Sequence, residues 1–87
     1  IGNTPTVLAV QGIARYQQSQ YRQSAQFFSQ IDQNELTSPL WTYYYGMASK
    51  QLDEKERAAS LLNKAVQLGL PANLESQANE ALASLQQ

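Results

Sequence analysis

The side chains that could carry acid–base or metal chemistry are few. The 87 residues include no cysteine and no histidine, so a disulfide, a thiolate metal site and an imidazole base are all excluded. Asp53, Glu54 and Glu56 form the densest group of carboxylates, in a run that also contains Lys55 and Arg57. Carboxylates bind Ca²⁺ or Mg²⁺ when an oxygen-rich loop surrounds them, and this run has no such loop. We interpret it as the solvated start of a helix.

The remaining polar residues do not form a recognisable catalytic pattern either. Asp32 and Glu35 are three residues apart and have no basic or nucleophilic partner nearby in the sequence. The four glycines are scattered, so there is no glycine-rich phosphate loop. We therefore predict no catalytic residue, no metal ligand and no cofactor, and we expect a protein that is not an enzyme.

The composition narrows the classes of partner. Six basic and seven acidic residues give a formal charge of −1, which provides no electrostatic footprint for nucleic acid or an anionic membrane. No apolar run approaches the ~20 residues that span a bilayer. We expect a protein partner, no nucleic acid and no direct membrane insertion.

The start Ile1-Gly2 lacks an initiator Met and a basic leader region, so we expect a fragment of a larger protein. The Gln- and Ser-rich surface favours a bacterial protein of the cytoplasm or, preferably, the cell envelope.

Aromatic residues provide the clearest sign of a binding surface. Tyr43, Tyr44 and Tyr45 are consecutive, and Met47 follows them. Successive helical side chains point ~100° apart, so at least one of the three tyrosines should be exposed. Tyrosine and methionine are both favoured in recognition surfaces. The alternative, that these side chains only pack in the core, stays open.

The elements that would position these residues recur along the chain, with a repeat period of about 34 residues. The matching positions are Thr4-Pro5 with Ser38-Pro39, Gly12 with Gly46, Ser19 with Asp53, Ser24 with Ala58, Phe28 with Leu62, and Ile31 with Ala65. Thr4 and Ser38 can each cap a helix whose first residue is the following proline. Ser19 and Asp53 mark second helices, the latter through a capping box over residues 53–56. Asn34 and Gly69 lie where these second helices should end.

Apolar spacing then predicts five helices, at about residues 5–18, 21–34, 39–52, 54–68 and 72–86. Trp41, Tyr45, Ala48 and Leu52 form one helical stripe. Gly12 and Gly46 are expected where two helices approach closely, because a helical glycine otherwise costs ~1 kcal/mol relative to alanine. The fifth helix has one apolar face and one polar face, as a capping helix requires.

Over roughly residues 5 to 70 the chain resembles the tetratricopeptide repeat family. The second unit carries the family pattern in Trp41, Tyr45-Gly46, Lys55, Ala58, Leu62, Ala65 and Pro71. The first unit keeps Gly12, Tyr21 and Phe28 but has Arg15 and Ser24 where the family prefers Tyr and Ala, and it has no proline at its end. The resemblance implies an all-α fold, a right-handed α-α superhelix of about five antiparallel helices. Its single domain, residues 1–87, would comprise repeat 1 (5–38), repeat 2 (39–71) and a capping helix (72–87). An ordinary antiparallel helical bundle is the alternative.

The resemblance also implies a function, the binding of a peptide or helix of a partner protein in a concave groove. The expected partner-binding residues are Ile13, Tyr16, Gln17, Tyr43, Tyr44, Met47, Lys50 and Gln51. The Lys, Asn and Arg with which some members hold acidic chaperone tails are replaced here by Ala9, Ile13, Tyr44, Leu74 and Ala78. An apolar or amphipathic partner is therefore expected. The alternative is a structural or oligomerisation segment that self-associates through apolar helix faces, above all Val10 and Ile13.

Overall fold

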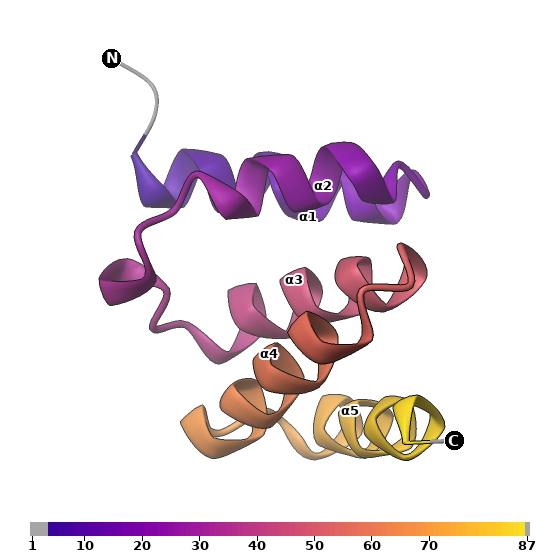
Figure 1. The fold of residues 1–87 in the computed structure, drawn as a ribbon. Helices are drawn as coiled ribbons and strands as arrows, with labels where there is room; N and C mark the ends of the chain where they lie inside the picture. Colours follow the sequence, from indigo (N-terminus) through magenta and orange to yellow (C-terminus); the bar gives the residue numbers. More distant parts are fainter. Residues whose placement is uncertain (1–3, 87) are drawn as a thin grey trace.

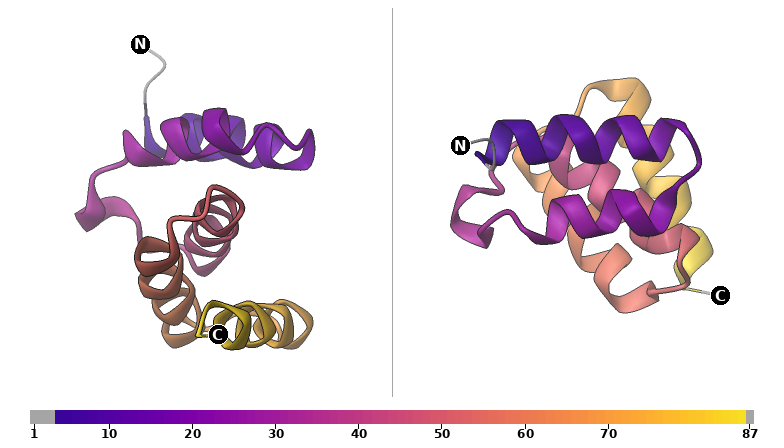
Figure 2. Two further views of the ribbon diagram at one scale, coloured as in Figure 1. Left: turned by 45° about the vertical axis from the view of Figure 1, so that its right-hand side comes forward. Right: turned by 90° about the horizontal axis from the view of Figure 1, so that it is seen from above.

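The computed structural model describes residues 4–86, which form five α-helices stacked in three layers (Figure 1). The helices are α1 (Pro5–Gln17), α2 (Tyr21–Ser29), α3 (Pro39–Gln51), α4 (Lys55–Leu68) and α5 (Ala72–Leu85), with a 3-10 turn η1 (Gln33–Glu35) between α2 and α3. The α1/α2 pair forms one layer, the α3/α4 pair the next, and α5 the last (Figure 2). The prediction of an all-α fold is confirmed for these residues, which contain no strand. Residues 1–3 and 87 of the predicted domain lie outside the described part.

The first helix of each pair, α1 and α3, begins as the sequence predicts. The Val7 amide donates to Thr4 Oγ1 and the Trp41 amide to Ser38 Oγ, both at 3.3 Å. A proline follows each cap, where its missing N–H costs nothing. The same four-residue pattern therefore starts both α1 and α3.

The second helix of each pair, α2 and α4, begins differently from the prediction. Ser19 and Asp53 are not side-chain caps; both have a φ of 63°, in the left-handed region. They form the tight turns between α1 and α2 and between α3 and α4, and neither Gln20 nor Glu54 caps through its side chain. The predicted capping box at Asp53 is wrong, because this residue is needed for the turn. A short polar side chain is one of the few that adopt this backbone conformation readily.

The largest difference concerns the end of α2, predicted at residue 34 and found at Ser29. Asp32 starts η1 instead, since its Oδ1 accepts the Asn34 amide at 3.0 Å. Asp and Ser compete with helical hydrogen bonds by binding nearby backbone groups. Asn34 therefore lies in η1 and does not end a helix, whereas Gly69 ends α4 with a φ of 105° as expected.

The glycines at positions 12 and 46 are sites of close helix contact, as predicted. A Cβ at Gly12 would lie 2.7 Å from Phe28 Cε2, and one at Gly46 would lie 2.9 Å from Leu62 Cγ. Phe28 and Leu62 are both fully buried. Each helix pair is thus held together by the same glycine-to-large-residue contact, which recurs after one repeat period.

Two apolar clusters form the core. The first joins α1, α2 and the following loop through Leu8, Ala9, Phe28, Ile31 and Leu36. The second joins α3, α4 and α5 through Tyr43, Leu62, Ala65, Leu70, Ala78 and Ala81. The half-buried side chain of Tyr44 packs against both clusters. Among the helices of residues 4–86, none combines the length and apolarity that a membrane crossing requires.

Candidate functional site

The eight residues predicted to bind a partner lie on α1 and α3. Ile13, Tyr16 and Gln17 belong to α1, and Tyr43, Tyr44, Met47, Lys50 and Gln51 belong to α3. Gln17 and Gln51 are exposed, and the others except Tyr43 are half-buried. Ile13, Tyr16 and Gln17 precede Met47, Lys50 and Gln51 by one repeat period, so they occupy equivalent helical positions.

Four tyrosine rings form a continuous row across this part of the molecule. Edge-to-face contacts join Tyr21 to Tyr16, Tyr16 to Tyr44 and Tyr44 to Tyr43, with ring centroids 5.4, 5.3 and 5.3 Å apart. Edge-to-face pairs of this kind are favourable beyond the area they bury. The row fixes the rings of α2, α1 and α3 relative to one another.

The row ends on α5, because the Tyr43 hydroxyl donates to Gln77 Oε1 at 2.9 Å. Tyr43 is only 3% exposed, so it belongs to the core and not to the accessible binding surface predicted for it. Tyr44 and Tyr45 are both half-buried, so none of the three consecutive tyrosines is fully exposed. These three tyrosines are buried to this degree because α5 and the α1/α2 pair pack against α3.

The environment of the row disfavours the charged form of two phenols. Burial raises the pKa of Tyr16, with further contributions from Tyr43, Tyr21 and Tyr44. Burial and the neighbouring Tyr44 likewise raise the pKa of Tyr43. Both groups therefore stay neutral at physiological pH, and the Tyr43 hydroxyl keeps the proton that it donates to Gln77.

A depression of about 570 Å³ lies between α3 and α5 beside this row. Its lining combines apolar, charged and polar side chains: Met47 and Lys50 from α3, and Gln77, Glu80, Ala81 and Ser84 from α5. Met47 and Lys50 were predicted as binding residues. Ser84 was missed although it follows Lys50 by one repeat period, while no sequence signal pointed to Glu80. We call the accessible predicted residues together with this depression the α1–α3–α5 face.

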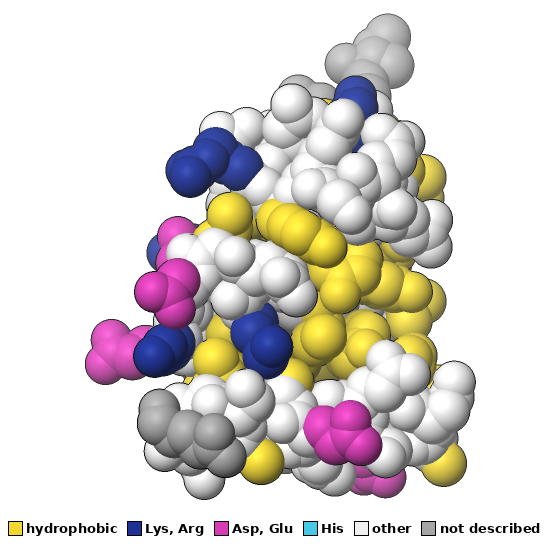
Figure 3. Space-filling model, turned by 90° about the vertical axis from the view of Figure 1, so that its right-hand side faces the viewer, with side chains coloured by type: hydrophobic (Ala, Val, Ile, Leu, Met, Phe, Trp, Pro, Cys, Tyr) yellow, Lys and Arg dark blue, Asp and Glu magenta, His cyan; other side chains and the backbone are white. Residues whose placement is uncertain are grey.

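The molecular surface separates apolar from charged regions. Figure 3 shows hydrophobic side chains gathered between the α1/α2 layer and α5, while many of the lysines, arginines and acidic residues in that view lie along its left edge. The only ion pair among the described residues joins Arg57 of α4 to Glu54, the residue before this helix, at 3.4 Å. The α1–α3–α5 face is therefore suited to contacts with apolar side chains, with Lys50 and Glu80 as its charged members.

Within residues 4–86, no three acidic side chains come together in an arrangement that could hold a metal ion. What the α1–α3–α5 face offers is contact area and hydrogen-bonding groups from three helices. Neither a protein-family model, nor a curated protein, nor a solved structure matches this chain.

Proposed function

We propose that the chain is a non-enzymatic interaction module of the tetratricopeptide type, with its helices in a right-handed superhelix. The recurrence of local geometry after one repeat period supports this proposal. The capped helix starts, the turns at φ 63° and the close contacts of Gly12 and Gly46 each occur once per unit. The residue that binds Tyr43, Gln77, lies one further repeat period along the chain, so α5 occupies the place of the first helix of a third unit.

The proposed partner is an amphipathic peptide or helix that binds the α1–α3–α5 face. The observation that carries this proposal is the depression between α3 and α5, in which apolar Met47 and Ala81 lie beside Lys50 and Glu80. An apolar side chain of the partner would enter the depression, while polar groups of the partner would contact the positive Lys50 and the negative Glu80. A helix laid in a groove uses this combination of apolar anchors and polar edges.

A peptide selection tests the proposal. Helical peptides with variable apolar positions would be displayed on phage and selected against the immobilised protein, and bound peptides would be mapped by ¹⁵N NMR. We expect shift changes centred on Met47, Lys50 and Gln77. Ser84 is exposed, so a Ser84→Arg variant should fill the depression without disturbing the core and weaken binding at least tenfold.

The matched control is Ala83→Arg, which adds the same side chain at an exposed neighbouring position of α5 outside the depression. It should leave binding within about twofold. Equal losses in both variants, or shift changes elsewhere on the molecule, would show that the depression is not the binding site. Tyr44 is unsuitable for this test, because it packs against both core clusters and its removal would also change stability.

A second candidate function is self-association through α1. Val7 and Val10 are 37% and 59% exposed, two large apolar side chains on adjacent turns of one helix. If this surface joins two copies, sedimentation equilibrium should show a dimer that Val10→Glu dissociates and Gln11→Glu, an equal charge change at an exposed neighbour, does not. Ile13 is half-buried against the first cluster and is therefore a poor position for this test. A concentration-independent monomer would exclude this function.

A further inference from the structure

The two helix pairs differ most where α2 ends, and a cavity lies at that place. Helix α4 continues to Leu68, whose counterpart one repeat period earlier is Asn34, but α2 stops at Ser29. Residues 30–38 instead form a loop that buries Ile31 and Leu36 in the first cluster. This loop, and not a continuation of α2, faces residues 57–64 of α4 across the cavity.

The cavity beside this loop has a volume of about 340 Å³, within the range of ~300–1,000 Å³ typical of small-molecule sites. Its walls come from the end of α2, the loop, α3 and α4: Ser29, Ile31, Gln33, Leu36, Tyr45, Arg57, Ser60, Leu61 and Lys64. None of these residues belongs to the α1–α3–α5 face. At about 30 Å³ for each water-sized group, the cavity holds roughly a dozen non-hydrogen atoms.

The charged side chains of this cavity are both positive. Arg57 and Lys64 are seven residues apart on α4, so they lie on one face of the helix about 10 Å apart along its axis. No aspartate or glutamate lines the cavity. The carboxylate of Asp32, on the adjoining loop, accepts the Asn34 amide at the start of η1.

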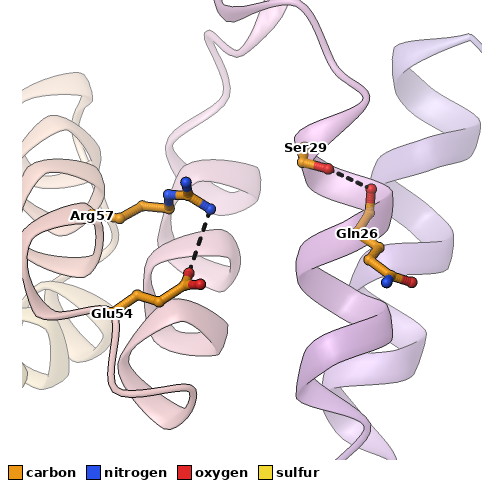
Figure 4. A network of polar contacts seen from close by, with 4 residues as sticks. All are labelled: Gln26, Ser29, Glu54 and Arg57. Carbon is orange, nitrogen blue, oxygen red and sulfur yellow. Dashed lines mark hydrogen bonds and ion pairs between the residues drawn. The ribbon is translucent and has the colours of Figure 1, made fainter.

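Arg57 is only loosely held by its acidic neighbour. Its guanidinium lies 3.4 Å from Glu54 Oε1, a long contact, and the two side chains are 54% and 44% exposed (Figure 4). Exposed pairs of this kind contribute little because water and salt screen them. Arg57 can therefore turn to an anionic group in the cavity without losing a strong interaction.

The apolar part of the lining is well ordered by the core. Ile31 and Leu36 are 6% and 3% exposed, and the Tyr45 ring stacks on the buried Phe28 at a centroid distance of 5.5 Å. Ser29 already donates its hydroxyl proton to the Gln26 carbonyl oxygen at 2.8 Å (Figure 4). Arg57 and Lys64 are the charged groups that can bind an anion above this hydrophobic wall, and Gln33 and Ser60 are neutral donors beside them.

We propose that this cavity binds a small carboxylate with an apolar body of about ten non-hydrogen atoms. The carboxylate contacts Arg57 and Lys64, and the apolar body lies against Ile31, Leu36 and Leu61. This ligand site is separate from the proposed peptide surface, so either can be present without the other. The combination of a few polar groups with an apolar lining is the usual composition of a small-molecule site.

The test uses 4-phenylbutyrate, which combines a carboxylate with a body of the right size, and the neutral isostere 4-phenylbutyramide. Each would be titrated into the ¹⁵N-labelled 87-residue protein and followed by NMR. We expect 4-phenylbutyrate to give saturable shifts at Ile31, Leu36 and Lys64, and the amide to bind at least tenfold more weakly, because charge-assisted hydrogen bonds are lost. Lys64→Gln should weaken carboxylate binding by a similar factor.

Lys55→Gln is the matched control, since it removes the same charge from an exposed position on α4 outside the cavity. It should change affinity by less than about twofold. Equal binding of the acid and the amide would overturn the proposal, as would shifts on the α1–α3–α5 face or no binding at millimolar ligand. The comparison of acid with amide uses the unaltered protein, so it decides the question even if a variant folds poorly.

Discussion

Replacing Gly12 by alanine tests whether the close approach of α1 and α2 depends on the missing side chain. Two effects oppose each other. In a helix, alanine is favoured over glycine by ~1 kcal/mol. The added Cβ, however, would lie 2.7 Å from Phe28 Cε2 and 2.9 Å from two further ring atoms.

The steric effect should win. Carbon atoms attract each other best at ~3.5–4.0 Å, so the new methyl group would overlap the ring by nearly an ångström. Phe28 is fully buried and cannot move into solvent. Overpacking of this kind costs ~1–3 kcal/mol. After subtraction of the gain in helix propensity, we expect a net loss of ~1 kcal/mol, which lowers the melting temperature by ~4–8 °C for a domain of this size.

Urea denaturation followed by circular dichroism measures this loss. The matched control compares glycine with alanine at the exposed neighbouring position Gln11, where alanine should be more stable by the propensity term alone. A double-mutant cycle with Phe28→Leu, which lacks the overlapping ring atoms, should show a coupling of ~1 kcal/mol. If the change from glycine to alanine raises the free energy of unfolding equally at positions 12 and 11, the contact between Gly12 and Phe28 does not constrain the helices.

Three further changes have defined outcomes. Tyr43→Phe removes the hydrogen bond to Gln77 and should reduce the free energy of unfolding by ~1 kcal/mol. Amide hydrogen exchange in α5 should become faster, and unchanged exchange would show that this bond does not hold the helix in place. Because the pKa of Tyr16 is raised on folding, the contribution of this phenol to stability should be complete below pH ~10 and be lost as the pH rises above it. Tyr16→Phe should therefore reduce the alkaline loss of stability in melting curves, and Tyr43, whose pKa is also raised, should account for a further part of that loss. The buried Ser49 hydroxyl has no hydrogen-bond partner among the described residues, so Ser49→Ala should increase the free energy of unfolding by ~1 kcal/mol. Urea titrations measure this change, and a loss of stability would show that the hydroxyl does have a partner.

Much of the fold could be predicted because its signals are local. A capping Thr or Ser followed by Pro determines where α1 and α3 begin through bonds that span only three residues. The repeat period then relates one unit to the next. These features require no knowledge of tertiary contacts, so α1, α3, α4 and α5 were each predicted to within one residue at either end.

The parts that could not be predicted depend on distant residues. The end of α2 is decided by the competition between helical bonds and the Asp32 turn, and by the burial of Ile31 and Leu36, in a segment whose polar composition resembles that of the helices. The burial of Tyr43 depends on α5, which provides Gln77 from one repeat period away. Glu80 enters the candidate face only because α5 packs against α3. Helical periodicity carries no information about such neighbours.

The position of Tyr44 between the two clusters has a consequence for how the molecule melts. A stack of helical units behaves as a chain of coupled elements, in which each unit has its own stability and neighbours communicate through their shared boundary. Tyr44 packs on both sides of that boundary, so the α1/α2 pair and the α3/α4/α5 group should lose their structure in a single transition. Trp41, Tyr45 and Leu61 also pack against the first cluster, so shortening Tyr44 alone would weaken this coupling and broaden the melting transition without separating the two groups completely.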